Sequence, residues 1–421
     1  MEDNLASWTF VDHALDDTGG KIVFQVRIRW SNLTNVVVEI PTSDGELAPW
    51  QDTISRFLQH EQSVDASEAK SIIDNVLTCC RLKYGDKGPL LANTLYVKDR
   101  AGQPHLVEAM DPDLEEALRR ASILFEGTED SLPLVARTSL QQATVKEGNF
   151  LAQTQPVWYD KRIHVAKGPT SAERAYDDLS EVPNLLSLKV RHPNIVPPPT
   201  ALITLSPEDG TICGFLLPLY KHGSLDRFAR KVRSQDEGFE CLLWKWFSQL
   251  VSAVQSLIEA ETYHGDIKPD NILVSESSDV VLIDFSRSAT TMPIAGPEVK
   301  EGKNQSFRAC QSYLTYSVVI KRTRKVCIPP DWPIDMIEKS EVYSIGRTMF
   351  FVCQGISMLD VYLKKGPENG EFLTRFSDQS WPSGSLQRII LACVNDDPRM
   401  RPSLAEVASM LESSDVENSL N

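Results

Sequence analysis

The sequence lacks the features that mark membrane-spanning, secreted and nucleic-acid-binding proteins. None of its apolar runs approaches the roughly 20 residues needed to cross a bilayer. The first residues, Met-Glu-Asp-Asn, contain neither the basic nor the apolar part of a signal peptide. Positive charge is scarce, because 43 Lys and Arg face 58 Asp and Glu and the formal net charge is −15. We therefore expect no membrane insertion, no nucleic-acid partner and a cytoplasmic location, with the nucleus as the alternative.

Cysteine is also sparse, and its spacing excludes the common zinc-binding pattern. The eight cysteines include one adjacent pair, Cys79 and Cys80, and the others lie far apart along the chain. Zinc sites usually need a CxxC pair, and the sequence contains none. We expect reduced and mostly buried thiols, because free cysteine packs like a small apolar side chain.

Acidic residues are concentrated in residues 1–133, which carry 12 Lys and Arg against 23 Asp and Glu, a net charge of −11. Alternating and helically spaced apolar residues in this segment predict strands at 21–30 and 36–40 and helices at 50–58, at 72–80 and from Asp111-Pro112 onward. We therefore expect residues 1–133 to form a small α+β accessory domain that ends in a polar linker.

From residue 134 the pattern changes to short strands followed by longer helices. The expected strands are 157–166 and 214–219, and the expected helices are 242–258 and 342–352. Residues 134–413 are long enough to bury a core of their own. Residues 414–421 are polar, and we expect them to form an irregular tail.

The strongest chemical signal is the run His-Gly-Asp-Ile-Lys-Pro-Asp-Asn-Ile-Leu-Val at residues 264–274. Eighteen residues after Asp266, a second aspartate, Asp284, follows an apolar run. Phosphoryl transfer from ATP needs an aligned nucleophile and compensation of charge, usually by metal ions on carboxylate and carboxamide oxygens. Asp266 can accept the proton of a substrate hydroxyl, and Lys268 can neutralise the γ-phosphate. Asn271 and Asp284 can converge on Mg²⁺.

These residues resemble the catalytic loop and the metal-binding motif of the protein kinases. A lysine two residues after the catalytic aspartate is typical of the serine/threonine type. The Gly-Asp loop, without the preceding arginine, is similar to that of divergent fungal kinases. The resemblance covers residues 134–413 and implies an α+β, bilobal protein kinase-like fold with a small β-rich lobe and a large helical lobe. It also implies ATP and Mg²⁺ as cofactors and a protein as substrate.

The resemblance extends to a candidate anchor for ATP. Val165-Ala166-Lys167 ends a predicted strand and is similar to the motif of the ATP-anchoring lysine. Its partner in the family is a helix glutamate, and Glu181 lies fourteen residues later. The alternative for Glu181 is a surface carboxylate, because Pro183 is expected to break the interior of a helix.

The segment Leu216–Leu225 resembles the hinge that binds adenine in the family. If Leu217 is the gatekeeper, the carbonyl of Pro218 and the amide of Tyr220 recognise the adenine. Proline lacks only the amide donor, so Pro218 removes nothing that this recognition needs. The alternative for Leu217 is an ordinary core leucine.

Three later motifs also resemble those of the family. Pro329-Pro330-Asp331-Trp332 stands where the family has Ala-Pro-Glu, and the segment ending in Arg401-Pro402 resembles the motif whose arginine pairs with that carboxylate. We therefore expect an ion pair between Arg401 and Asp331. The run that begins at Glu341 resembles the start of the central helix, with Glu in place of the usual Asp.

Glycine is scarce where the family needs it. Between residues 138 and 158 the sequence has one glycine, Gly148, although amides that cradle phosphates need several. Gly265 replaces the arginine on which an activation-loop phosphate docks in the family. Ser286 replaces the glycine of the metal-binding motif.

Three functions stay open at this point. The first is an active serine/threonine protein kinase, favoured by the presence of all four candidate residues of the phosphate site: Lys167, Asp266, Asn271 and Asp284. The second is a pseudokinase scaffold, favoured by the missing glycines. The third is a small-molecule kinase of the aminoglycoside phosphotransferase type, which also carries His-Gly-Asp. Lys268 and the motif around Arg401 favour the protein kinases over this third class.

Overall fold

The computed structural model describes a large part of the chain. The described residues are 9–15, 21–29, 33–41, 71, 95–100, 103–108, 112–126, 132–143, 145, 154–169, 172–208, 210–233, 238–285, 290–291, 296–298, 325–326, 332–356, 376 and 384–419. The helices expected at 50–58 and 72–80 lie outside them. The chain divides into two compact units, one mainly of Met1–Leu179 and Pro199–Leu219, the other of Ser180–Pro198 and most of the chain after Tyr220.

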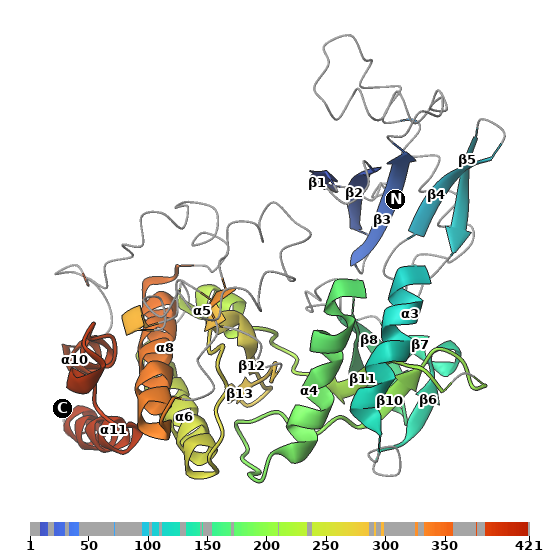
Figure 1. The fold of residues 1–421 in the computed structure, drawn as a ribbon. Helices are drawn as coiled ribbons and strands as arrows, with labels where there is room; N and C mark the ends of the chain where they lie inside the picture. Colours follow the sequence, from blue (N-terminus) through green and yellow to red (C-terminus); the bar gives the residue numbers. More distant parts are fainter. Residues whose placement is uncertain are drawn as a thin grey trace. The chain divides into compact units, whose positions relative to one another are not determined.

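The first unit begins with a sheet whose five strands lie in sequence order (Figure 1). The strands are β1 (Thr9–Leu15), β2 (Lys21–Arg29), β3 (Leu33–Pro41), β4 (Leu95–Arg100) and β5 (Gln103–Glu108). Neighbouring strands are antiparallel except β3 and β4, which run parallel. The strands expected at 21–30 and 36–40 are therefore confirmed, as β2 and as part of β3.

A second sheet follows in the same unit, with the strand order β6-β10-β11-β9-β8-β7. Its strands are β6 (Leu134–Ala136), β7 (Gln141–Gln142), β8 (Thr154–Tyr159), β9 (Arg162–Lys167), β10 (Ala201–Thr204) and β11 (Ile212–Pro218), and the short helix η4 (Arg137–Ser139) lies between β6 and β7. Val157, Ala166 and Phe215 are fully buried in it. The strand expected at 214–219 is confirmed as β11.

The single strand expected at 157–166 is wrong, because this segment is a hairpin of β8 and β9. The two strands pair antiparallel from Thr154 opposite Lys167 to Tyr159 opposite Arg162. Asp160 and Lys161 form the turn with φ angles of 46° and 61°. Two-residue hairpin turns with positive φ favour Asn-Gly or Asp-Gly. Asp-Lys is not one of these favoured pairs, so the turn could not be predicted from the sequence.

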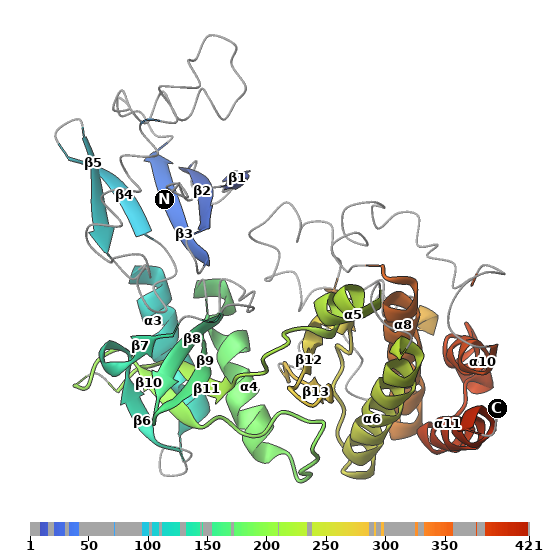
Figure 2. The ribbon, with the colours of Figure 1, turned by 180° about the vertical axis from the view of Figure 1, so that it is seen from behind.

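Helix α3 (Pro112–Ala121) and the short helix η2 (Ser122–Phe125) precede the second sheet. The helix expected from Asp111-Pro112 is thus confirmed. Acidic residues occupy its first turn and Arg119 and Arg120 its last, as the helix dipole favours. Helix α3 packs against β11 and against the short helix η5 (Ala172–Arg174), and Figures 1 and 2 both show it beside the second sheet. The boundary expected at residue 133 stays a prediction. Helix α3 precedes this boundary in the sequence, but η5 and β11, against which it packs, follow it.

Helix α4 (Ala175–Ser187) follows η5 directly and continues through Pro183. The expectation that Pro183 breaks the helix is therefore wrong. Proline removes the hydrogen bond to the carbonyl four residues earlier. The helix is nevertheless held by its buried side chains, because Leu179, Val182 and Leu185 are each fully buried.

The second unit is mainly helical. Its helices are α5 (Leu225–Arg233), α6 (Phe239–Glu259), α8 (Ile334–Gln354), α10 (Gly384–Cys393) and α11 (Leu404–Ser419), with the short helices η6 (Pro269–Asn271) and η10 (Pro398–Met400). Helix α6 packs against α8 and α11, and α10 packs against the same two helices. The helices expected at 242–258 and 342–352 are confirmed as α6 and α8.

Close packing in this unit depends on Gly346 of α8. A Cβ atom at this position would lie 2.7 Å from the Cβ of Cys393 and 2.8 Å from a methyl group of Val394. The glycine therefore allows the end of α10 to approach the backbone of α8. Almost the whole length of α8 is buried.

The polar tail expected at 414–421 stays a prediction as a separate segment, and α11 continues into it through Ser419. Extending an existing helix is easier than starting one, so a polar segment can remain helical at the end of a packed helix. Among the helices of the described part of the chain, none is long and apolar enough to cross a membrane.

Two small ladders complete the second unit. Strands β12 (Ile272–Val274) and β13 (Val280–Leu282) pair antiparallel, with Ile272 opposite Leu282. Strands β14 (Thr290–Thr291) and β15 (Lys325–Val326) form the other ladder. The first of these ladders positions the candidate catalytic residues.

Candidate active site

The loop between α6 and β12 brings three of the expected site residues together. Lys268 donates a hydrogen bond from Nζ to Oδ2 of Asp266 at 2.7 Å. Asn271 donates from Nδ2 to the backbone carbonyl of Asp266 at 2.9 Å and to Oδ2 at 3.3 Å. Asp266 and Asn271 are buried, and the side chain of Lys268 is 13% exposed. Their positions are thus fixed by one another.

Asp284 lies two residues after the end of β13, and the backbone connects it to the same loop. The amide of Ile283 donates to the carbonyl of Asn271 at 3.0 Å, so Asp284 follows a residue that is bonded to the catalytic loop. Asp284 has a φ angle of 70°, an uncommon conformation for a residue other than glycine. Such strain is found mostly where the surrounding structure needs it, often at functional sites.

His264 connects the loop to the segment before Asp284. Its Nε2 donates to the carbonyl of Ile283 at 2.8 Å, and its Nδ1 accepts from the amide of Asp266 at 3.1 Å. Only the neutral ring can donate through one nitrogen and accept through the other. Burial lowers the pKa of His264, which favours this neutral form. The ring also meets Phe285 edge to face, with 4.8 Å between the ring centres.

Glu341, in the first half of α8, binds the backbone of the loop. Its carboxylate accepts hydrogen bonds from the amide of Gly265 at 3.0 Å and from that of His264 at 3.3 Å. Gly265 has a φ angle of 84°, which favours glycine at this position. Burial raises the pKa of Glu341 to about 7, although the two amide bonds oppose this rise. The sequence placed the start of the central helix at Glu341, whereas α8 begins seven residues earlier, at Ile334. These contacts were not predicted.

Asn184 of α4 is a contact that sequence reasoning missed. Its Nδ2 donates to the carbonyl of Phe285 at 2.8 Å, across 101 residues of sequence. Phe285 is fully buried and follows Asp284 directly. No local pattern could have indicated this bond, because asparagine in a helix is usually a surface residue.

Three of the residues expected to bind the nucleotide lie on the second sheet. Lys167 ends β9 opposite Phe215 of β11 and is buried. Leu217 and Pro218 are at the end of β11, opposite Val165 and His164. Strand ends were the positions expected for Lys167 and the hinge.

Tyr220 and Glu181 belong to the second unit. Tyr220 lies two residues after the end of β11, and burial raises the pKa of its hydroxyl to about 12. Glu181 is fully buried on α4. The alternative of a surface carboxylate for Glu181 is therefore wrong, whatever its role.

Arg401 has a charged partner that the sequence did not predict. Arg401 forms a two-pronged ion pair with Glu298, from Nη1 to Oε1 at 2.7 Å and from Nη2 to Oε2 at 2.8 Å. Its remaining donors bind the carbonyls of Lys339, Asn395 and Asp396. No N–H group of the guanidinium is left for Asp331, which lies outside the described residues. Pro297-Glu298 is a proline–acid pair that lies earlier in the sequence than Pro330-Asp331, the pair chosen in the expectation.

The donor atoms around Asn271 fit Mg²⁺. Because Nδ2 of Asn271 is used toward Asp266, its Oδ1 can serve a cation together with the carboxylate of Asp284. Mg²⁺ prefers such oxygen ligands and usually completes its shell with phosphate oxygens and water. Within the described residues no group of three His, Cys, Asp or Glu side chains could hold a metal alone. Mg²⁺ held by Asn271 and Asp284 would need further oxygen ligands, which the phosphates of a nucleotide could supply.

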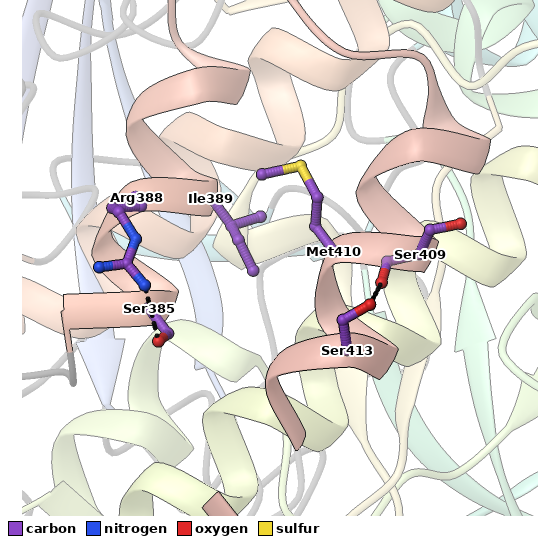
Figure 3. A pocket seen from close by; sticks show the side chains of 6 residues that line it. All are labelled: Ser385, Arg388, Ile389, Ser409, Met410 and Ser413. Atoms are coloured by element: carbon purple, nitrogen blue, oxygen red, sulfur yellow. Dashed lines mark hydrogen bonds between the residues drawn. The ribbon is translucent and has the colours of Figure 1, made fainter. Parts of the chain in front are cut away.

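A pocket between α10 and α11 lies outside this cluster (Figure 3). Its volume is about 320 Å³, and its lining residues are Ser385, Arg388, Ile389, Ser409, Met410 and Ser413. Arg388 donates to the hydroxyl of Ser385 at 3.1 Å, and the hydroxyl of Ser413 donates to the carbonyl of Ser409 at 2.8 Å. The lining has no carboxylate or carboxamide, so the pocket offers no metal ligands of the kind found at Asn271.

A β-rich unit, a helical unit and a buried Asp-Lys-Asn loop beside a second aspartate define a class of phosphate-transferring proteins. Residues 161–411 match the family model described as protein kinase domain. This match covers more than half of the chain, and the chain belongs to the protein kinase family. The expected α+β, bilobal protein kinase-like fold is thereby confirmed.

Several curated proteins are similar to the chain at modest identity. CBL-interacting serine/threonine-protein kinase 10 of Arabidopsis thaliana is 23% identical over 223 residues, 52% of this chain and 40% of that protein. CBL-interacting protein kinase 2 of Oryza sativa subsp. japonica is 25% identical over 224 residues, 52% of this chain and 44% of that protein. Sperm motility kinase 3A of Mus musculus is 27% identical over 223 residues, 53% of this chain and 39% of that protein. The chain thus spans less than half the length of these relatives.

Proposed function

We propose that the chain is a serine/threonine protein kinase that transfers the γ-phosphate of Mg-ATP to hydroxyl groups of a protein substrate. One observation carries this proposal. The side chains of Lys268 and Asn271 both donate hydrogen bonds to the carboxylate of Asp266, and a backbone hydrogen bond connects Asn271 to the residue before Asp284. A carboxylate, an ammonium and two oxygen ligands for Mg²⁺ are the groups that phosphoryl transfer needs.

Each residue has one role in this reaction. Asp266 orients the substrate hydroxyl and accepts its proton as the oxygen attacks the γ-phosphorus. Lys268 compensates the charge of the transferred phosphoryl group, and ADP leaves with the pair of electrons of the broken P–O bond. Asn271 and Asp284 hold Mg²⁺, which supplies positive charge at the phosphates when bound.

The nucleotide-binding residues come from the second sheet and from α4. Lys167 binds the α- and β-phosphates, and Glu181 is the carboxylate that orients this lysine. The carbonyl of Pro218 and the amide of Tyr220 bind the adenine edge, with Leu217 as the gatekeeper. The buried state of Lys167 and Glu181 supports these roles, because buried charged groups are rarely found without a charged or polar partner.

Serine/threonine specificity rests on Lys268 and on the relatives. A lysine two residues after Asp266 is the pattern of that class in the family resemblance. The relative from Arabidopsis thaliana carries serine/threonine-protein kinase in its name. The match to a protein kinase domain supports a protein substrate over a small molecule.

A second function, a pseudokinase scaffold, is favoured by one observation. Between residues 138 and 158 the chain has a single glycine, Gly148, for the loop that clamps the phosphates in the family. Side chains on such a loop keep its amides away from the phosphates. A scaffold would keep the fold and lose the transfer.

A transfer assay with radiolabelled ATP and a generic basic protein tests the proposal. We expect wild-type protein to label the substrate, and Asp266→Ala and Asp284→Ala each to lower turnover at least ~100-fold. Glu276→Ala is the matched control, because Glu276 is an exposed acid between β12 and β13 and pairs with Lys221 on the surface. We expect its turnover to equal that of wild type.

The binding of Mg-ATP separates the two functions. At a ligand concentration of about 100 Kd, binding should raise the free energy of unfolding by ~2.7 kcal/mol. Stabilisation by Mg-ATP without any transfer would favour the scaffold. A protein that neither transfers phosphate nor responds to Mg-ATP would contradict the nucleotide site altogether.

A further inference from the structure

Helix α3 packs one continuous apolar face into the first unit. Leu114, Leu118 and Ala121 recur at the spacing of one helix face, and each is at most 2% exposed. Phe125 of η2 continues this face and is 1% exposed. The elements in contact with α3 include η5 and β11. Helix α3 therefore packs against a strand of the second sheet and against the short helix η5.

The opposite face of α3 is charged and faces solvent. It carries two i,i+4 ion pairs, Glu115 with Arg119 and Glu116 with Arg120. The side chain of Arg120 is 77% exposed. Within α3, the buried apolar residues thus lie on one face and the charged residues on the other.

The position of α3 matters because η5 leads directly into helix α4. Helix α4 begins at Ala175, the residue after the end of η5, and Ala175 is fully buried. The contact between α3 and η5 thus holds the beginning of α4. Near its other end, α4 carries Asn184, which donates to the carbonyl of Phe285 beside Asp284. One helix therefore connects the contact of α3 with the segment of the proposed metal ligand.

Helix α3 is also an addition to the kinase domain. The family match begins at residue 161, and α3 ends at residue 121. A helix outside the matched domain thus contacts η5 and β11, two elements inside it.

We propose that α3 is a positioning element of the active site, which sets the place of α4 and, through Asn184, that of the segment containing Asp284. Leu118 is its central positioning residue. This inference rests on the proposed function for its catalytic consequence. Small displacements matter here, because a shift of about 1 Å in a reacting group can lower a rate ~100-fold.

A double-mutant cycle in the full chain tests the catalytic part. We expect Leu118→Ala to lower kcat/KM for ATP about tenfold after correction for the fraction folded. The matched control, Arg120→Ala on the exposed face, should leave kcat/KM unchanged. The volume-conserving Leu118→Met should restore most of the loss.

The partner variant in the cycle is Asn184→Ala, which removes the bond from α4 to Phe285. In that background Leu118→Ala should lower kcat/KM less than about twofold, because the connection is already broken. Full additivity of the two effects would overturn the proposal, and so would wild-type turnover in Leu118→Ala.

Amide hydrogen exchange tests the same proposal without any catalysis. In Leu118→Ala we expect faster exchange in α4 and in the peptide that contains Ile283–Phe285, and unchanged exchange in α6. An increase confined to α3 would overturn the positioning role. If wild-type protein transfers no phosphate and the exchange result is still as expected, the proposed function fails and the role of α3 stands.

Discussion

At the scale of single residues, Glu341 has a carboxyl group whose charge changes near neutral pH. Burial raises its pKa to about 7 from an ordinary value of 4.5. Between these two values the folded protein holds the proton more tightly than the unfolded chain does. The contribution of Glu341 to the free energy of unfolding is therefore largest below pH 4.5 and falls as the pH rises to about 7.

Glu341→Gln removes this titration. Between pH 4.5 and pH 7.5 we expect wild-type protein to lose about 3 kcal/mol of unfolding free energy relative to the variant, at 1.36 kcal/mol per pKa unit. Urea unfolding at several pH values measures the difference. Glu412→Gln, an exposed carboxyl on α11, is the control and should follow wild type. Parallel curves for wild type and Glu341→Gln would show that Glu341 does not titrate in this range.

The ion pair of Arg401 and Glu298 gives a second prediction at this scale. The Arg401 side chain is fully buried, and Glu298 neutralises it through two hydrogen bonds. Glu298→Ala leaves a buried guanidinium with carbonyl partners alone. We expect the free energy of unfolding to fall by about 3–5 kcal/mol, as for other broken buried pairs.

Denaturant unfolding measures this loss, and the exposed pair of Asp397 and Arg399 provides the control. The Arg399 side chain is 85% exposed, so Asp397→Ala should lower the free energy of unfolding much less than Glu298→Ala does. Asp331→Ala should also have a small effect, because Arg401 has no donor left for it. A large loss in Asp331→Ala and none in Glu298→Ala would restore the pairing expected from the sequence.

At the scale of elements, α4 contains an unfavourable residue in its interior. Pro183 removes the amide that would bond to the carbonyl of Leu179. Pro183→Ala restores this donor, and we expect the free energy of unfolding to rise by about 1–3 kcal/mol, within the ~3 kcal/mol by which proline is disfavoured. Thermal unfolding measures the change. A fall in stability would mean that the packing of the proline ring outweighs the missing hydrogen bond.

The two longest helices were predicted from their long, regular apolar patterns. Helices α6 and α8 each run for 21 residues and keep a buried face along their length. The hairpin of β8 and β9 was missed because an Asp-Lys turn has no glycine or asparagine to mark it. The continuation of α4 was missed because packing of buried residues on both sides of Pro183 overrides the local preference.

In the candidate site, contacts between residues close in the sequence could be predicted, and contacts between distant residues could not. Asp266, Lys268 and Asn271 lie within six residues of one another, so their meeting follows from one loop. The bonds of Glu341 to Gly265 and of Asn184 to Phe285 span 76 and 101 residues. Contacts of that range depend on tertiary packing, which the spacing of residues along the chain does not encode.

At the scale of the whole molecule, the role of α3 decides where the kinase unit begins. The sequence placed a domain boundary at residue 133, after α3. In the structure α3 packs against η5 and β11, which lie after that boundary. The first sheet ends at Glu108 with β5, and α3 begins at Pro112. A chain that begins between these two residues keeps α3, whereas one that begins at residue 134 removes it.

We expect residues 109–421 to fold and residues 134–421 to be unstable or insoluble. Removing α3 and η2 takes away the buried side chains of Leu114, Leu118 and Phe125. Burial of each contributes about 1.5–3 kcal/mol, so the loss of about 5–9 kcal/mol is comparable to the total stability of a typical domain. Circular dichroism and urea unfolding of the two fragments measure the difference. If the fragment from residue 134 unfolds at the same urea concentration as the longer one, α3 is dispensable and the boundary expected from the sequence is right.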